Sequence, residues 1–199
     1  MDFLHGGKMD EQGSELPPVV EEDIDPGFAD VVNKMSDAES IRQCIECGTC
    51  TGVCVVQDVY PEYNIRRILT KAALGLKNEV LESEEIWMCA HCYSCISRCP
   101  RGVRPSERIA DLQGMALRRY VNNQGVKHAK AYIDSILTYG KINEAKVTIN
   151  SIGYQGLMAQ GMFALTLIMK GKAPKYFKKG ITDMDKLKPI IEEILEGKA

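Results

Sequence analysis

Eight cysteines are the residues of this sequence whose type and spacing could do chemistry. They form two runs: Cys44, Cys47, Cys50 and Cys54, then Cys89, Cys92, Cys95 and Cys99. Both runs follow the spacing C-x2-C-x2-C-x3-C, which is typical of proteins that bind two [4Fe–4S] clusters. Three thiolates at the short spacing can wrap around one cluster, whereas the fourth points toward the other cluster.

This spacing predicts crossed ligation between the two runs. One cluster is assigned to Cys44, Cys47, Cys50 and Cys99, and the other to Cys89, Cys92, Cys95 and Cys54. Because such ligation joins two segments 45 residues apart, we expect folding to depend on cluster insertion.

Zinc and disulfide bonds fit these cysteines less well. Zinc sites usually pair C-x2-C motifs across a longer loop and do not place four ligands within eleven residues, as each run does. Cysteine makes up about 4% of the chain, below the roughly 8–10% of a small disulfide scaffold. The segment from Met1 to Asp10 also lacks the apolar core of a signal peptide, so we expect a reducing, cytoplasmic compartment.

The residues beside the cysteines have supporting roles in this interpretation. Small residues around the first run suit a backbone that approaches a cluster closely: Gly48, Thr49, Thr51 and Gly52. His91 is expected to be a neighbour and not a ligand, because the cysteines already have the required spacing. Trp87 and Tyr93 are expected to pack so that they keep water off the cluster.

A basic strip follows the second run, made of Arg98, Arg101, Arg104 and Arg108. One interpretation is a solvated face. The other is a face that raises the potential of the nearby cluster and docks an acidic partner.

Hydrophobic periodicity predicts a mainly α fold from residue 41 onward, without convincing strand alternation. Four helices are expected, around residues 65–76, 105–120, 132–139 and 183–195. Pro105 suits the first turn of the second helix, and the fourth starts near Asp183. Gly75 and Gly140 lie near the ends of the first and third helices. A further apolar stretch, residues 157–169, is shorter than the about 20 residues of a membrane span. We therefore expect no membrane span, and a helix buried in the core or against another protein.

Charge is unevenly distributed, although the net charge is only −2. Residues 1–40 carry −9 and residues 41–199 carry +7, and the acidic segment also contains three prolines. We divide the chain into an acidic extended arm or disordered tail (1–36), a two-cluster domain (37–125) and a C-terminal helical segment (126–199). The arm is either solvated or lies along a partner. The near-neutral total argues against nucleic-acid binding.

The sequence lacks the motifs of a substrate site. It contains neither G-x-G-x-x-G nor G-x-x-x-x-G-K-[S/T], and its three histidines are scattered. Since all eight cysteines are assigned as ligands, no thiol remains for disulfide chemistry. We expect no catalytic residue on this chain and a role in carrying single electrons between a donor and an acceptor supplied by other proteins.

The segments Cys44–Cys54, reading CIECGTCTGVC, and Ile86–Gly102 resemble the C-type iron–sulfur subunit of the soluble heterodisulfide reductases of methanogenic archaea. The resemblance is close over residues 38–125 and implies an α-helical ferredoxin domain with its two cluster loops between helices. It also implies a relay from the A-type subunit, which contains flavin and iron–sulfur clusters and bifurcates electrons, to the B-type subunit. The latter reduces the mixed disulfide of coenzymes M and B in methanogenesis, and a hydrogenase or formate dehydrogenase would feed the assembly. Val55 departs from the usual Cys-Pro ending of a run, but proline supplies no ligand.

Two alternatives share the cysteine spacing. The iron–sulfur proteins of anaerobic glycerol-3-phosphate dehydrogenase or of fumarate reductase-like enzymes usually add further cysteine motifs, which this chain lacks. An oxygen-sensing cluster protein is the other alternative. A relay needs two reversible redox couples, whereas a sensor would lose a cluster in air.

Overall fold

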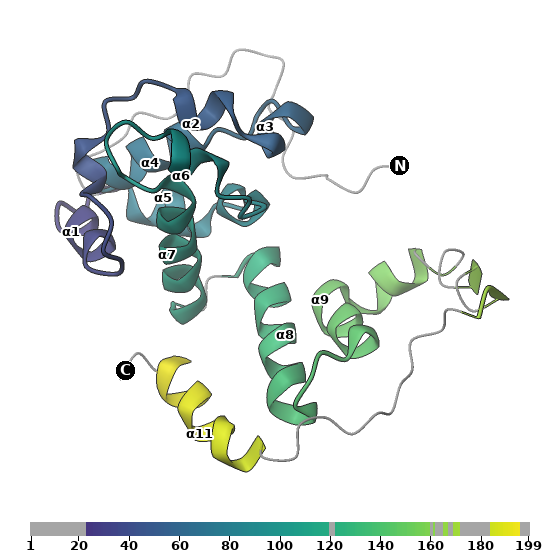
Figure 1. The fold of residues 1–199 in the computed structure, drawn as a ribbon. Coiled ribbons are helices and arrows are strands. Elements are labelled where there is room, and N and C mark those ends of the chain that lie inside the picture. Colours follow the sequence, from purple (N-terminus) through teal and green to yellow (C-terminus); the bar gives the residue numbers. More distant parts are fainter. Residues whose placement is uncertain are drawn as a thin grey trace.

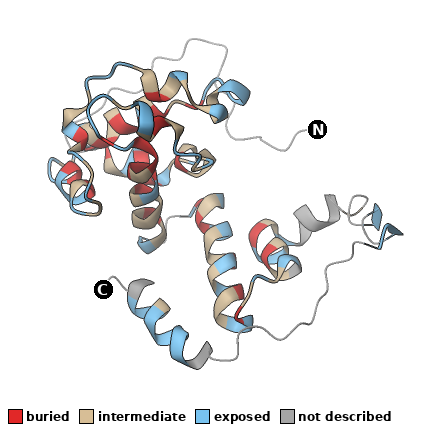
Figure 2. Ribbon diagram, viewed as in Figure 1, coloured by how far each residue is buried: buried red, intermediate tan, exposed pale blue. Residues whose placement is uncertain are grey.

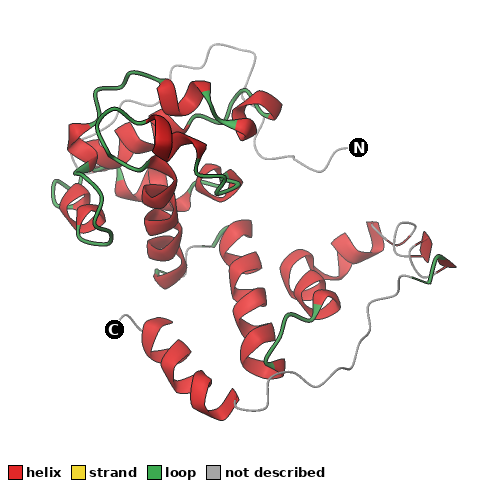
Figure 3. Ribbon diagram, viewed as in Figure 1, coloured by secondary structure: helices red, strands yellow, loops and turns green. Residues whose placement is uncertain are grey.

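The computed structural model describes residues 23–119, 122–159, 161, 165–166, 169–171 and 184–195. Within these ranges the secondary structure is helical and includes no strand, which confirms the mainly α prediction (Figure 3). The elements are α1 (Phe28–Asn33), η2 (Ile41–Gln43), α2 (Thr49–Gly52), α3 (Val55–Val59), α4 (Ile65–Leu74), α5 (Lys77–Glu82), η3 (Glu85–Met88), α6 (Ser94–Arg98), α7 (Pro105–Arg118), α8 (Gln124–Tyr139), α9 (Glu144–Ala159) and α11 (Met184–Leu195).

Helices α1 to α7 gather around one core, and α8, α9 and α11 extend away from it (Figure 1). The core brings together side chains from every part of the first group, including Phe28, Ile41, Leu69, Ile86 and Leu112. Buried residues are accordingly concentrated there (Figure 2). Two cysteines, Cys50 and Cys95, belong to the same buried cluster, so the cysteine loops are built onto the core.

Helix α4 follows the predicted pattern closely. Its Ile65, Ile68, Leu69 and Ala72 are buried, and it ends at Gly75, whose φ of 90° is a left-handed conformation that suits glycine. The helix begins at Asn64, whose side chain accepts a hydrogen bond from the Arg67 amide at 3.0 Å.

The later helices also begin and end near the predicted positions. Helix α7 begins at Pro105 in its first turn, and α8 ends at Gly140 with a φ of 67°. Helix α8 begins at Gln124, earlier than its predicted apolar stripe, because Asn123 caps it by accepting from the Val126 amide at 2.8 Å.

The arm assigned to residues 1–36 differs from the structure in its last part. Residues 1–22 lie outside the described residues, but α1 is a helix whose Phe28, Ala29 and Val32 are fully buried in the core. The Asp25 amide donates to the Gly75 carbonyl at 2.9 Å, and the Lys77 ammonium donates to the Asp25 carboxylate at 2.9 Å. Three apolar side chains on one short helix face therefore outweigh the acidic composition of this segment.

The apolar stretch of residues 157–169 is described in part: residues 157–159 end α9, and residues 161, 165, 166 and 169 are also described. Leu165 and Met169 expose 63% and 81% of their surface, so the core interpretation is wrong for these two. In the part of the chain that is described, no helix has the length and apolar character needed to cross a membrane.

Candidate metal centre

The two cysteine loops fold in the same way. Each begins directly after a short 3-10 helix, η2 or η3, and leads into a short α-helix, α2 or α6. Each also turns twice through left-handed backbone, at Glu46 and Gly48 in the first loop and at His91 and Tyr93 in the second. These positions are related by the 45-residue offset between the runs. Such turns are costly for residues other than glycine, so the surrounding structure must hold them.

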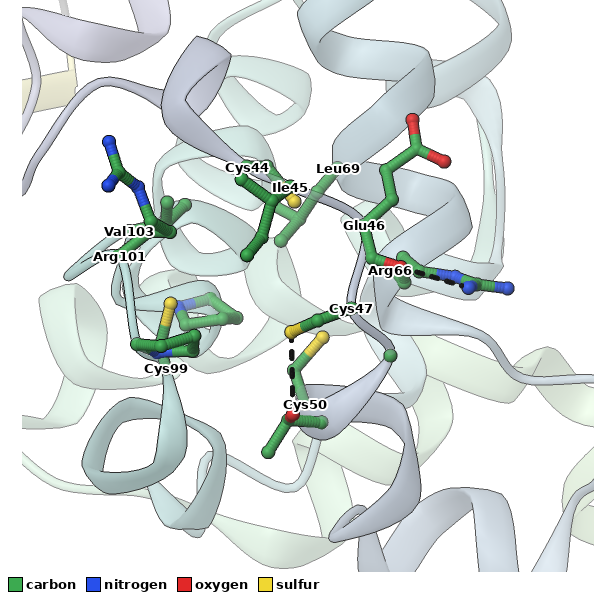
Figure 4. Close-up of a pocket in the computed structure, with 14 residues that line it drawn as sticks. Cys44, Ile45, Glu46, Cys47, Cys50, Arg66, Leu69, Cys99, Arg101 and Val103 are labelled. Carbon is green, nitrogen blue, oxygen red and sulfur yellow. Dashed lines mark hydrogen bonds between the residues drawn. The ribbon is translucent and has the colours of Figure 1, made fainter.

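The first loop lines a hollow of about 360 Å³. Figure 4 shows the sulfur atoms of Cys44, Cys47 and Cys50 around this hollow, with the Cys99 sulfur on its other side. Cys99 belongs to the second run and follows α6. The structure therefore brings together the first cysteine set named from the sequence.

The second loop lines a separate hollow of about 290 Å³. Its walls include Cys89, Cys92 and Cys95, together with Cys54 from the first run. Helices α2 and α6 pack against each other, and this contact lets each run contribute its fourth cysteine to the other hollow. The second set named from the sequence is thus also brought together, whereas ligation itself stays a prediction.

The donor set of each hollow fits a [4Fe–4S] cluster, which is held by four cysteine thiolates. Among the residues that the structure describes, no three histidine, cysteine or acidic side chains converge to hold a single metal ion. A cluster requires a different arrangement, because each thiolate binds a different iron and the four ligands surround a hollow.

Cys47 and Cys92, the second cysteines of the two runs, are exposed, and the pKa of each is lowered. For Cys47 the main cause is the Thr49 hydroxyl, which lies 3.3 Å from the sulfur. For Cys92 the main cause is the Ser94 backbone, followed by the Ser94 hydroxyl at 3.5 Å. Equivalent hydroxyls thus favour the thiolate, the form that binds metal, at equivalent positions of the two loops.

The pKa values of three other cysteines, the buried Cys50 and Cys95 and the half-buried Cys89, are shifted in the opposite direction. Burial raises the pKa of Cys50, Cys89 and Cys95, so these thiols need a bound metal to lose their protons at neutral pH. The Thr51 hydroxyl lies 4.0 Å from the Cys50 sulfur but donates its proton to the Asn64 side chain at 3.2 Å. Cys50 therefore faces a hydroxyl whose proton is already used.

Two buried hydroxyls lie against the cysteines of the second hollow. Ser106 is 1% exposed and lines the hollow, and its hydroxyl and backbone amide oppose the rise in the Cys95 pKa caused by burial. Tyr63 is fully buried; burial raises its pKa, and the neighbouring Cys89 raises it further. Neither hydroxyl makes a hydrogen bond among the described residues. Sulfur ligands of a cluster would supply the missing acceptors, which supports the fit of the second hollow.

His91 lines the second hollow and is tied to α7. Its Nε2 lies 3.1 Å from the Oε1 of Gln113, whose Nε2 donates to the Ile86 carbonyl at 2.8 Å. Since the amide nitrogen donates to Ile86, its oxygen must accept, and His91 therefore carries a proton on Nε2. This arrangement agrees with a supporting role for His91. Gln113 has no motif in the sequence that could have identified it.

The aromatic neighbours differ from each other. Tyr93 lines the second hollow and exposes 55% of its surface, so it lies where this hollow meets the solvent. Trp87 is half-buried and packs against the first turn of α8, where a Cβ added at Gly125 would overlap its indole ring.

The basic strip predicted after the second run is only partly correct. Arg98, Arg101 and Arg104 are exposed, but Arg108 is fully buried. Its guanidinium donates to the carbonyls of Val32, Ala38 and Glu39 and to the Ser36 hydroxyl, at 2.8–3.0 Å. Its place one turn before buried Leu112 was a signal in the sequence that it faces the core.

The chain was compared with known proteins. Residues 40–103 match a family described as a 4Fe-4S dicluster domain. A relative from Methanopyrus kandleri, named as the C-type iron-sulfur subunit of CoB–CoM heterodisulfide reductase, is 36% identical over 106 residues, which make up 50% of this chain and 55% of that protein. A relative from Methanocaldococcus jannaschii, named as a second C-type iron-sulfur subunit of the same reductase, is 32% identical over 157 residues, covering 78% of this chain and 75% of the relative. The chain belongs to the family of C-type heterodisulfide reductase subunits.

Membership of this family agrees with the cysteine pattern and supports a [4Fe–4S]-binding protein. The chain spans about half the length of the first curated relatives it matches. A more distant relative is the iron-sulfur subunit of 8-methylmenaquinol:fumarate reductase from Wolinella succinogenes, 29% identical over 142 residues, with 65% of this chain and 44% of that protein covered. The alternative drawn from the cysteine spacing therefore also has a counterpart, at lower identity.

Proposed function

We propose that this chain is the electron-relay subunit of a heterodisulfide reductase complex and holds two [4Fe–4S] clusters. The observation that carries the proposal is the pair of hollows, each lined by three cysteines of one run and the fourth of the other. Each cluster, when bound, supplies a one-electron redox couple.

The side chains of this chain have three roles at the two sites: they bind the clusters, they exclude water on one side, and they leave the other side open to a partner. Cys44, Cys47, Cys50 and Cys99 are the proposed ligands of the first cluster, and Cys89, Cys92, Cys95 and Cys54 those of the second. The buried Cys50 and Cys95 face the apolar core, which excludes water from one side of each site. The exposed Cys47 and Cys92 mark the sides that a redox partner can approach.

The names of the relatives support a place in a heterodisulfide reductase complex, and the resemblance suggests which partners it has there. We propose that electrons come from the A-type subunit, which contains flavin and iron–sulfur clusters, and pass to the B-type subunit, which reduces the heterodisulfide of coenzymes M and B. A hydrogenase or formate dehydrogenase supplies the assembly. The relatives from Methanothermobacter thermautotrophicus and Methanococcus maripaludis carry names that include H2 and H2/formate, which supports this input. The eight cysteines, assigned as metal ligands, favour the cytoplasm.

Reconstitution with purified partners tests the relay. The chain is purified anaerobically from its native source and is expected to contain about eight iron and eight sulfide per polypeptide, since each cluster has four of each. Its reduced clusters should be reoxidised by the heterodisulfide only when the B-type subunit is present. Reoxidation by fumarate with the catalytic protein of a fumarate reductase, and not by the heterodisulfide, would favour the second family. A chain that folds normally with zinc and no iron would refute both.

Crossed ligation is tested by a matched pair of substitutions. Cys99→Ser is expected to impair the cluster at Cys44, Cys47 and Cys50, because the Cys99 sulfur lines that hollow. Cys54→Ser should impair the cluster of the second run for the same reason. Electron paramagnetic resonance (EPR) of the reduced variants shows which signal is lost. Loss of the second-run signal in Cys99→Ser would overturn the assignment.

A further inference from the structure

Five buried side-chain atoms have no hydrogen-bond partner among the described residues: Tyr63 Oη, Trp87 Nε1, Ser106 Oγ, Arg108 Nε and Asn123 Nδ2. Two of them are hydroxyls, those of Tyr63 and Ser106. Ser106 lines the second hollow, and Tyr63 is buried two residues before Ile65, which lines it as well.

An unpaired hydroxyl is costly inside a protein, because it has given up its hydrogen bonds to water. Tyr63 is fully buried and has no route to solvent, and Ser106 is almost as enclosed, in the first turn of α7. Cys95 lines the same hollow as Ser106, and the Tyr63 hydroxyl lowers the pKa of Cys89. A thiolate bound to iron carries negative charge and accepts hydrogen bonds, whereas a neutral thiol is a weak acceptor. Both hydroxyls are therefore placed for the metal-bound state of the site.

The first hollow lacks such donors among the described residues. The hydroxyl beside its buried Cys50 belongs to Thr51, whose proton is donated to Asn64 at 3.2 Å. The hydroxyls at the exposed cysteines, Thr49 and Ser94, occupy equivalent positions in the two loops and do not distinguish them. The two sites also differ in charge, since Arg66 and Arg101 line the first hollow. Among the described residues, buried hydroxyls without a hydrogen bond are found only beside the second site, at Tyr63 and Ser106.

We propose that the hydroxyls of Tyr63 and Ser106 donate hydrogen bonds to the Cys89 and Cys95 sulfurs and selectively raise the reduction potential of the second cluster. Reduction adds negative charge to a cluster, and hydrogen bonds to its sulfurs stabilise that charge. Tyr63 and Ser106 would thus affect the reduction potential indirectly, through the cysteine ligands, and would not bind iron themselves. The inference rests on the proposed function, because it requires clusters in both hollows.

The test is an anaerobic redox titration of the cluster-loaded chain followed by EPR. Tyr63→Phe keeps the buried ring and removes only the hydroxyl, and Ser106→Ala does the same for the serine. Each variant is expected to shift the midpoint potential of the second cluster to more negative values, and the double variant to shift it further. The first cluster should keep its potential. The signals are assigned with the Cys54→Ser and Cys99→Ser variants.

Tyr60→Phe is the matched control, because Tyr60 lies three residues away and exposes 37% of its surface. It should leave both potentials unchanged. Pulsed EPR in deuterated buffer gives a second readout: the coupling of an exchangeable proton to the second cluster should weaken in Tyr63→Phe. Ser106→Ala keeps the inference testable if Tyr63→Phe assembles poorly.

The outcomes separate the inference from the proposed function. If the variants retain full iron content and both midpoints stay at their wild-type values, the tuning role is refuted while the two-cluster relay stands. A shift of both midpoints together would also refute it, because the effect would not be selective. If the wild-type chain binds no iron, the proposed function fails, and the inference fails with it.

Discussion

Arg108 offers a sharp test of how the cluster domain is held together. Its guanidinium is fully buried and links α7 to α1 and to the segment that leads into the first cysteine loop. Arg108→Met keeps an unbranched stem of similar width but removes every donor. The buried Val32 carbonyl would then keep only the Met35 amide, at 3.3 Å, and the partly buried Ala38 and Glu39 carbonyls would lose their Arg108 donor.

The expected cost follows from these partners. A hydrogen bond from a charged group contributes about 1.5–3 kcal/mol, and the full amount applies to the buried Val32 carbonyl. The contributions at Ala38 and Glu39 are discounted to about half, because water can reach these carbonyls. Methionine also avoids the desolvation cost of the guanidinium, which offsets part of the loss. We expect a net destabilisation of about 3–5 kcal/mol for opening this region.

Amide hydrogen exchange of the cluster-loaded chain measures this quantity locally. Because about 1.4 kcal/mol corresponds to a factor of ten, exchange of the α1 amides should accelerate by roughly 150-fold or more. Arg104→Met is the control: Arg104 lies one turn earlier, is exposed and pairs with Glu107, so its loss should cost at most about 1 kcal/mol. Equal exchange of α1 in the two variants would show that the buried guanidinium does not hold this helix, and the reasoning would be refuted.

Two other predictions concern α8 and the clusters. Gly125→Ala should displace Trp87, because the added Cβ would overlap the indole ring, and should lower the free energy of unfolding by about 1–3 kcal/mol. Trp87 is the chain's single tryptophan, so its fluorescence reports the change. An unaltered fluorescence spectrum and unaltered stability would contradict this packing. Chelating the iron should melt α2 and α6, of four and five residues, because helices this short are unstable alone, while α8 and α9 remain helical. Hydrogen exchange that is unchanged in α2 and α6 after iron removal would contradict the coupling of folding to cluster binding.

Three cysteines of each set could be predicted from the sequence because their spacing is a local property, whereas the fourth comes from the other run and was predicted from the ligation typical of two-cluster proteins with this spacing. A run of ligands within eleven residues must form one loop, and two identical runs indicate two equivalent loops. The same holds for α4 and α7, whose apolar periodicity and terminal Gly75 or Pro105 are local signals. These features depend on neighbours a few residues away.

Other features depend on residues far apart in the chain, and the sequence offered no direct signal for them. Composition assigned residues 23–36 to an acidic arm, because the burial of Phe28 requires helices that come later in the chain. Gln113 contacts His91 across 22 residues and Ile86 across 27. Arg108 was counted as exposed by its charge, although its carbonyl partners lie 69 to 76 residues earlier.

The repeated cysteine spacing gives no indication that the surroundings of the two sites differ. Cysteines at equal spacing predict equal loops, and the structure bears this out down to the paired hydroxyls of Thr49 and Ser94. The buried hydroxyls come instead from outside the repeat, Tyr63 from the segment before α4 and Ser106 from the start of α7. A relay between a donor and an acceptor benefits from two clusters of different potential, and the ligand sets alone are too alike to provide one. The proposed difference comes from the residues that pack around the ligands, so removing a single buried hydroxyl at Tyr63 should alter one redox couple and leave the other unchanged.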